Sequence, residues 1–220
     1  MSDFLERGVS LYCDLHSAGR IMRMIPVCGY GLHEHHEGDE EMLEVQRAAA
    51  VAFGLRSIWS NAHGEDFPAV LKGTSLDGAW LARVPAIYCE TTGTGACYEK
   101  DVELYSQGIR NLIRHLDIAD GPPLEPVGGQ RIVEDYTPAS GNLQANNVTP
   151  VGGLFQSSVT LYDKVAAGDL IGVVTDMFGD VLHECRAPSE GVVICIRHLA
   201  RVEPMDALAT LAPDAGEPED

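Results

Sequence analysis

The chain has 220 residues, enough for one large domain or two modest domains with a sizeable core. Hydrophobic residues make up 45% of it, as in ordinary globular proteins, and this argues against a disordered chain. With 15 basic and 33 acidic residues the net charge is −18, which repels nucleic acid phosphates and anionic lipid headgroups. No apolar run approaches about 20 residues. We therefore expect neither a nucleic acid partner nor a membrane partner.

The six cysteines are scattered along the chain, mostly within apolar stretches, and form no C-x-x-C pair. This spacing indicates reduced, buried thiols rather than a disulfide framework or a zinc knuckle. The first seven residues show no signal-peptide pattern. Both observations predict a cytoplasmic protein.

The first half of the chain alternates predicted strands with predicted helices. Short apolar runs that are typical of buried strands occupy residues 9–15, 55–59 and 84–89. Predicted helices occupy residues 40–54, 76–82 and 101–116, and the two longer ones carry their apolar residues along one side. This order predicts an α/β domain, to which we assign residues 1–121. A helix end predicted at residues 3–8 suggests that the chain opens inside a larger unit.

The composition and the hydrophobic pattern of the sequence change after residue 121. Residues 122–212 have little helix signal and contain short apolar runs separated by Gly, Pro and Asp. This spacing predicts a small all-β sandwich or barrel. Residues 213–220 are acidic and small, and we expect them to be disordered.

Candidate functional residues follow the first predicted strand. Asp14 and His16 lie two residues apart, so both side chains point to the same face where the strand ends. In open α/β sheets, ligands bind outside the carboxyl ends of the strands. The pattern therefore suits a metal-ligating His16 with Asp14 nearby to fix it. The alternative is a helix N-cap by Asp14 or Ser17 and a surface histidine.

Glu90 follows the apolar strand predicted at residues 84–89 and precedes a loop rich in Gly and Thr. A carboxylate at the end of a buried strand, beside a metal-bound water, suits the general base of a hydrolase. The alternative is a hydrogen-bonded loop glutamate. The loop Gly93-Thr94-Gly95 is too short to cradle a phosphate.

Other histidines have less informative spacing. His33, His35 and His36 crowd into one acidic loop, and adjacent residues do not converge on one ion as i, i+4 pairs do. We interpret this cluster as a solvated polar loop, with adventitious metal binding as the alternative. Surface or structural roles are expected for the remaining ones, His63, His115, His183 and His198.

Together, these motifs resemble the succinylglutamate desuccinylase/aspartoacylase family, a branch of the zinc carboxypeptidase clan. The matching segments are Asp14-Leu15-His16-Ser17, Glu90 with its Gly-rich sequel, and the β-rich run from Val165 to Val193. Within that run, Gly168-Asp169, Phe178-Gly179, Ala187-Pro188 and Gly191-Val192-Val193 look like the C-terminal β domain of the family. The same run resembles biotinyl/lipoyl-type barrel sandwiches. It has no lysine at the turn where a carrier would be modified, which argues against a carrier role.

The resemblance implies an activity and a mechanism. Family members bind one zinc ion through an N-terminal His-x-x-Glu pair and a later histidine, and His16 matches this later histidine. Glu90 matches the glutamate that activates the zinc-bound water and passes its proton to the leaving amine. The resemblance therefore implies Zn²⁺ as cofactor, a small N-acyl amino acid or related amide as substrate, and Asp14 as a supporting residue.

The sequence departs from the family pattern upstream of His16. Only 15 residues precede it, and they contain neither the His-x-x-Glu pair nor the arginines that grip the substrate. We therefore expect an N-terminally incomplete carboxypeptidase-like sheet with an unpaired edge, and weak zinc binding by this chain alone. Such an edge favours a homo-oligomer or a complementing chain that carries the pair. The alternative function is a catalytically incompetent fragment that acts as a binding or assembly module.

Overall fold

The computed structural model describes residues 8–32, 39–62, 74–122, 129–135, 140, 143, 146–214 and 216. The helices are α2 (Asp39–Phe53), α4 (Ser75–Leu81) and α5 (Glu99–His115). The strands of the first half are β1 (Tyr12–Leu15), β2 (Met22–Met24), β3 (Val27–Gly29), β4 (Gly31–Leu32), β5 (Ser57–Ala62), β6 (Ala86–Glu90) and β7 (Arg131–Asp135). The strands of the second half are β8 (Gly153–Ser157), β9 (Lys164–Val165), β10 (Leu170–Thr175), β11 (Val181–Arg186), β12 (Gly191–Arg197), β13 (Arg201–Val202) and β14 (Ala209–Ala212).

A mixed sheet forms the centre of the first part. Its strand order is β1-β6-β3-β5-β4, and β7 pairs with the other side of β5. Strands β1 and β6 are parallel, whereas β3 runs antiparallel to β6. The sheet and the helices confirm the predicted α/β class, and the observed elements overlap the predicted ones at residues 9–15, 40–54, 84–89 and 101–116.

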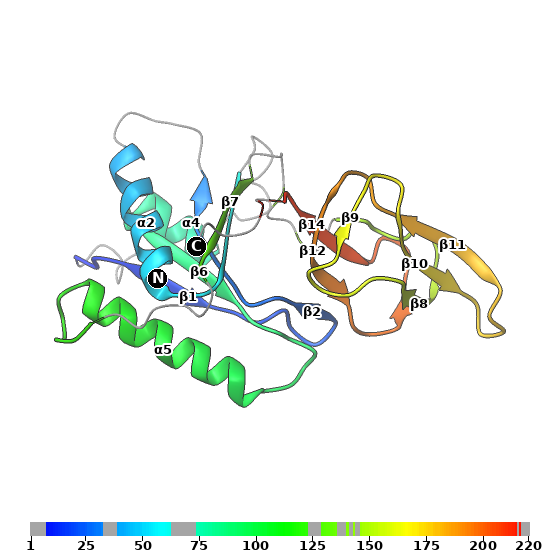
Figure 1. The fold of residues 1–220 in the computed structure, drawn as a ribbon, viewed down its shortest axis with the longest axis horizontal. Coiled ribbons are helices and arrows are strands. Elements are labelled where there is room, and N and C mark those ends of the chain that lie inside the picture. The colour runs from blue at the N-terminus through cyan, green and yellow to red at the C-terminus, as the bar shows by residue number, and fades with distance from the viewer. Residues whose placement is uncertain are drawn as a thin grey trace.

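Helices α2 and α5 cover one face of this sheet. Alternate residues of β6, Ile87 and Cys89, point into a core that also holds Phe53 of α2 and Leu112 of α5. Gly108 lets the two helices approach, because a Cβ atom there would lie 2.3 Å from the Phe53 ring. Figure 1 shows the helices together in one part of the molecule and strands β8 to β11 in the other.

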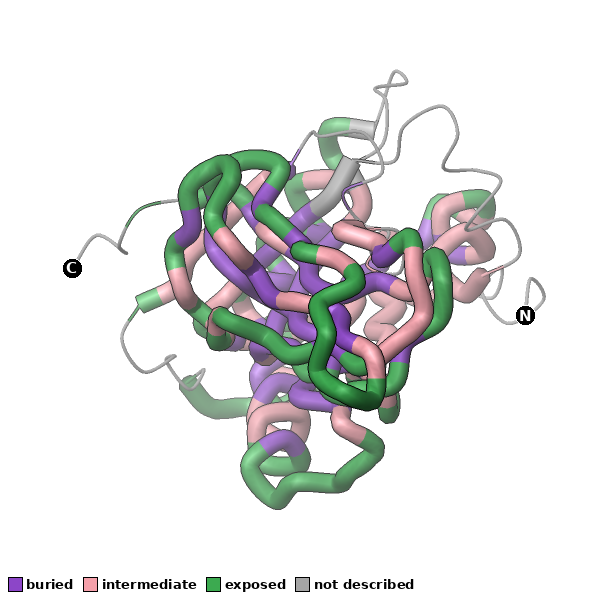
Figure 2. Tube along the Cα trace, turned by 90° about the vertical axis from the view of Figure 1, so that its right-hand side faces the viewer, coloured by how far each residue is buried: buried purple, intermediate pink, exposed green. Residues whose placement is uncertain are grey.

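The second part consists of two small antiparallel arrangements. One sheet has the order β11-β10-β8-β13, and the other has the order β14-β12-β2 with β9 also paired to β12. Both sheets contribute to one shared core of apolar side chains, which includes Phe155, Val174, Val193 and Leu208. Figure 2 shows buried segments running through the interior of the molecule, with exposed loops around them. The finer likeness to a biotinyl/lipoyl-type barrel sandwich stays a prediction.

Two strands cross the boundary predicted at residue 121. Strand β2 leaves the first part and pairs with β12, while β7 returns from the second half to pair with β5. The sequence did not predict this crossing, because it depends on pairing between distant segments. A three-residue strand such as Met22–Met24 is too short for its sequence to specify its partner. The two parts are therefore joined through their sheets as well as through the connecting chain.

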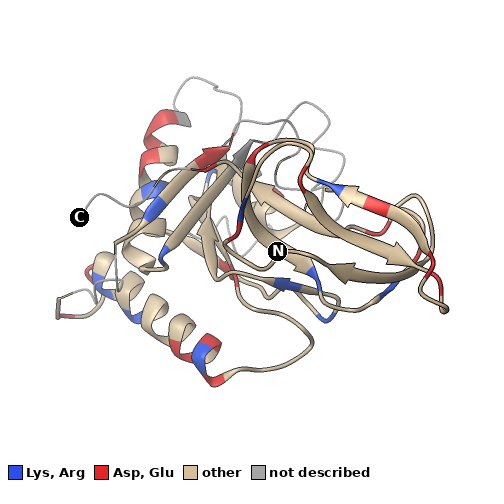
Figure 3. Cartoon of the chain, turned by 45° about the vertical axis from the view of Figure 1, so that its right-hand side comes forward, with Lys and Arg blue, Asp and Glu red and all other residues tan. Residues whose placement is uncertain are grey.

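The structure also bears on several smaller expectations. The helix end predicted at residues 3–8, except for Gly8, and the histidines at 33, 35, 36 and 63 lie outside the described residues. Most of the tail predicted to be disordered, residues 213–220, also lies outside the described residues. Asp214 is described, however, and forms ion pairs with Arg131 and Lys164. All six cysteines are free thiols. Each described helix is too short or too polar to cross a bilayer. Figure 3 shows Lys and Arg spread over α5 and over strands of the second part.

Candidate active site

The pairing of β1 with β6 brings the predicted site residues together. The two strands are parallel, with Asp14 opposite Tyr88, and the backbone N–H of His16 donates to the carbonyl of Cys89 at 2.8 Å. His16 therefore leaves β1 at the level where Glu90 ends β6. Because both strands end at the same edge, their polar side chains share one carboxyl-terminal rim.

Asp14 holds the imidazole of His16. The Nε2 atom of His16 lies 3.0 Å from Oδ1 of Asp14, and the other carboxylate oxygen accepts a hydrogen bond from the hydroxyl of Ser75. Ser75 opens α4, whose N-terminus is capped by Thr74. The imidazole is half-exposed, whereas the carboxylate behind it is largely covered. This arrangement fixes the ring and leaves its second nitrogen available to a ligand.

Glu90 carries a largely covered carboxylate with an unused oxygen. Its Oε2 atom is buried and has no hydrogen-bond partner among the described residues. Burial raises the pKa of Glu90 from 4.5 to about 7, while His16 works in the opposite direction and Asp14 adds to the rise. A carboxylate that titrates near neutral pH can both accept and donate a proton during one reaction cycle.

The loop after Glu90 is held from two sides. Asp101 of α5 accepts hydrogen bonds from the backbone N–H of Thr92 at 3.2 Å and from its hydroxyl at 3.0 Å. On the other side, Thr94 N–H donates to the carbonyl of Met22 at 2.9 Å. Gly93 has φ +79°, and a Cβ atom there would lie 2.8 Å from that same carbonyl oxygen. The glycine-rich loop after Glu90 therefore allows the backbone to pack closely against the chain at Met22.

The second part of the molecule contributes to the surroundings of Glu90. Burial raises the pKa of Cys195 on β12 to about 12, and the negative charge of Glu90 adds to this rise. Cys195 packs with Met24, Trp59 and Ile194 in the cluster that joins the two parts. Sequence reasoning missed this neighbour and also missed Ser75. Neither residue stands in a motif, and both come close only through tertiary packing.

Zinc is the metal that the family resemblance implies, and the described side chains fit one part of a zinc site. His16 with Asp14 has the chemistry of a ligand and its orienting carboxylate, and the unpartnered Oε2 atom of Glu90 suits a neighbouring proton acceptor. A catalytic zinc ion takes three protein ligands. Within the described ranges, no group of three or more His, Cys, Asp or Glu side chains is placed to hold a metal ion.

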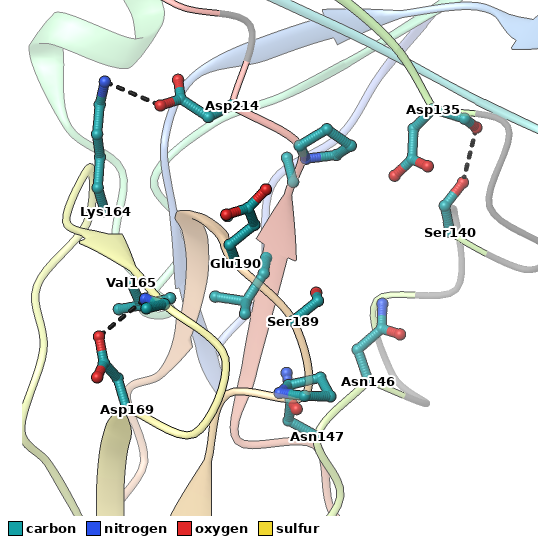
Figure 4. A pocket seen from close by; sticks show the side chains of 16 residues that line it. Asp135, Ser140, Asn146, Asn147, Lys164, Val165, Asp169, Ser189, Glu190 and Asp214 are labelled. Atoms are coloured by element: carbon teal, nitrogen blue, oxygen red, sulfur yellow. Dashed lines mark hydrogen bonds and ion pairs between the residues drawn. The ribbon is translucent and has the colours of Figure 1, made fainter.

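A separate cleft of about 930 Å³ lies between the two parts, and neither His16 nor Glu90 lines it. Figure 4 shows its polar lining, which includes Asp135, Asp169, Glu190 and Asp214. Several of these carboxylates have structural partners: Lys164 lies 2.9 Å from Asp214, and the backbone N–H of Ala166 donates to Asp169. The polar groups of this cleft thus stabilise its walls.

Comparisons with known proteins agree with this fold. No family model matches the chain. A curated relative, the N-alpha-acetyl-L-2,4-diaminobutyric acid deacetylase of Halomonas elongata, is 26% identical over 204 residues, which cover 90% of this chain and 55% of the relative. The chain thus spans about half the length of that protein.

Solved structures extend the comparison. A succinylglutamate desuccinylase from Silicibacter sp. TM1040 matches with a TM-score of 0.79 and 20% identity over 96% of this chain and 61% of its own. The product-bound ectoine utilization protein EutE (DoeB) from Ruegeria pomeroyi matches with a TM-score of 0.79 and 21% identity, and the match covers 96% of this chain and 62% of that protein. A succinylglutamate desuccinylase/aspartoacylase from Rhodobacter sphaeroides matches with a TM-score of 0.77 and 22% identity, and the match covers 96% of this chain and 62% of that protein. The chain therefore has the fold of the succinylglutamate desuccinylase/aspartoacylase family, and the resemblance predicted from its motifs is confirmed.

Proposed function

We propose that this chain carries the His16 and Glu90 side of a hydrolytic site that cleaves the amide bond of a small N-acyl amino acid. The observation that supports the proposal best is the free Oε2 atom of Glu90, buried at the strand ends beside the His16–Asp14 pair. The names of the relatives agree with this chemistry, because they describe a deacetylase of an N-acetylated amino acid and a desuccinylase.

Glu90 acts first as a general base and then as a general acid. Its carboxylate takes a proton from the attacking water, and the same oxygen later returns the proton to the leaving amine. A pKa of about 7 keeps both protonation states accessible near neutral pH. Burial against the second part of the molecule limits the exchange of this proton with bulk water.

His16 would hold a zinc ion through the ring nitrogen that does not face Asp14. When bound, zinc supplies a Lewis acid that polarises the amide carbonyl and lowers the pKa of a bound water. Asp14 keeps the ring in one orientation, and Ser75 keeps Asp14 in place. Since three ligands are needed, we propose that the others come from outside the described residues or from a complementing chain.

Two further expectations belong to this proposal. The part formed by β8 to β14 is a barrel-sandwich module that closes over the catalytic rim and carries no covalent cofactor, because its turn at residues 176–180 has no lysine. The six free thiols favour a reducing compartment such as the cytoplasm.

A zinc titration of the metal-free chain, followed by amide NMR, tests the site. We expect weak binding that shifts the signals of residues 15–17 and 90–92 and that disappears in His16→Ala. The matched control, His115→Ala, alters a histidine at the end of α5 and keeps the shifts. Tight one-to-one binding, or shifts confined to the histidines at 33, 35 and 36, would contradict the proposed site.

An amide hydrolysis assay tests the role of Glu90. N-acetyl-2,4-diaminobutyrate and N-succinylglutamate are supplied with zinc, and the released amine is measured. Glu90→Gln should lower any hydrolysis about 100-fold or more, the range of a lost general base. Glu44→Gln, at an exposed position of α2, serves as the control and should keep the full rate. Equal rates in the two variants would favour the non-catalytic assembly module.

A further inference from the structure

Helix α5 holds the chain at the ends of both strands that carry the candidate site residues. Its Asp101 and Tyr105 lie four positions apart and therefore share one face of the helix. The carboxylate of Asp101 accepts hydrogen bonds from the backbone N–H and the hydroxyl of Thr92, two residues after Glu90. The hydroxyl of Tyr105 donates to the backbone carbonyl of His16. One helix thus contacts the chain just after β6 and just after β1.

The backbone of His16 is bonded at both of its polar atoms. Its N–H donates to the carbonyl of Cys89 at 2.8 Å, and its carbonyl accepts the hydrogen bond from the Tyr105 hydroxyl. Two residues later, the N–H of Ala18 donates to the carbonyl of Thr91 at 3.1 Å. Of these three bonds, the one from Tyr105 comes from a helix, whereas the other two continue the pairing of β1 with β6.

Tyr105 is itself held in place by packing. Its ring lies edge-on to the ring of Phe53, with centroids 6.2 Å apart and an interplanar angle of 78°. Phe53 is buried in the core between the sheet and the helices, and Tyr105 packs against that core. Because a tyrosine side chain has few torsion angles, packing of the ring also determines where the hydroxyl lies. The core therefore sets the position of the hydroxyl that reaches His16.

We propose that Tyr105 is a positioning residue of the candidate site, which fixes the backbone of His16 and thereby the orientation of its imidazole. The ring is carried by this backbone, so a change in the backbone at His16 would swing the ring relative to Asp14. The distance of 3.0 Å between Nε2 of His16 and Oδ1 of Asp14 therefore depends on where the His16 backbone is held. Tyr105 acts through that backbone and takes no part in metal binding or proton transfer.

The test measures the χ1 torsion of His16 by NMR in the metal-free chain. Three-bond couplings from the backbone nitrogen and carbonyl carbon to the ring carbon Cγ show whether the side chain keeps one rotamer. We expect one rotamer in the native chain and averaged couplings in Tyr105→Phe, which keeps the ring and loses only the hydroxyl. Asp14→Ala removes the carboxylate that faces the imidazole and serves as the positive control for averaging.

Tyr30→Phe is the matched control, because it also removes a tyrosine hydroxyl that bonds a residue distant in sequence. The Tyr30 hydroxyl donates to Glu134 at 2.7 Å. Glu134 lies on β7, which is separated from β1 by β6, β3 and β5 in the sheet. This variant should lose stability and keep one His16 rotamer. The comparison separates a loss of stability from a loss of ring orientation.

A zinc titration and an amide hydrolysis assay connect the ring to the proposed function, on which this step rests. Residues that orient a metal-binding histidine change metal affinity or activity about 10- to 100-fold when they are altered. Because Tyr105 acts through the backbone, Tyr105→Phe should weaken zinc binding at His16 about 10-fold, at the lower end of that range. Any hydrolysis should show kcat lowered by a similar factor and KM little changed.

The rotamer measurement separates this proposal from the proposed function. A single His16 rotamer in Tyr105→Phe would overturn the proposal, whatever the hydrolysis assay shows. Averaged couplings in the native chain or in Tyr30→Phe would also overturn it, as would unchanged zinc affinity in Tyr105→Phe if the native chain binds zinc at His16. Averaging confined to Tyr105→Phe and Asp14→Ala would support it even if the native chain neither bound zinc nor hydrolysed an amide, and only the proposed function would then fail.

Discussion

The cost of holding a charged Glu90 in the candidate site can be measured as a pH-dependent stability. In the unfolded chain the carboxyl group titrates near 4.5, and in the folded chain its pKa is about 7. The folded state therefore binds this proton more tightly, and the ionised group destabilises the protein as pH rises from about 4.5 to about 7. The shift corresponds to about 3 kcal/mol at full effect, and partial exposure reduces the expected cost to about 1–3 kcal/mol.

Glu90→Gln removes this charge and tests the magnitude. At pH 8 the metal-free variant should be about 1–3 kcal/mol more stable than the native chain, which is a rise in Tm of roughly 2–10 °C for a chain of this size. At pH 4 the two should be nearly equal, because Glu90 is then protonated in both states. Urea unfolding followed by tryptophan fluorescence measures the difference, with Glu44→Gln as the exposed control. An equal effect at both pH values would refute the reasoning.

Two further predictions concern packing around the site. Ser75→Ala removes the hydroxyl that donates to Asp14 and should cost about 1 kcal/mol in urea unfolding, whereas Ser189→Ala at an exposed position should be neutral. Gly108→Ala places a methyl group 2.3 Å from the Phe53 ring, so it should lower the free energy of unfolding by about 1–3 kcal/mol despite the better helix propensity of alanine. A stabilised Gly108→Ala protein would contradict the described contact between α2 and α5.

Much of the first part of the fold could be predicted from the sequence because its elements are long and periodic. The helix predicted at 101–116 is observed as α5 at Glu99–His115, and the apolar run before Glu90 forms β6. His16 and Glu90 could be expected at one rim because each follows an apolar strand, and parallel strands end at the same edge. Their neighbouring positions follow from the pairing of β1 with β6.

The remaining features depend on contacts between distant residues. Three-residue β2 carries no pattern that selects β12 as its partner, so its place in the second sheet could not be predicted. The same is true of Ser75, which reaches Asp14 across 61 positions of sequence. A hydroxyl at a helix start is equally typical of an ordinary cap, and only tertiary packing turns it toward a carboxylate.

The crossing of β2 into the second sheet has a consequence for Glu90. The loop after Glu90 pairs with β2, since Met24 N–H donates to Thr92 at 3.1 Å and Arg23 forms a bridge with Gly93. Strand β2 in turn pairs with β12, where Cys195 lies opposite Met24. The strand that carries Glu90 is therefore tied, through one short strand, to the part that covers it. Because burial is the largest contribution to the raised pKa of Glu90, any motion that opened this junction would hydrate the carboxylate and return its pKa toward 4.5.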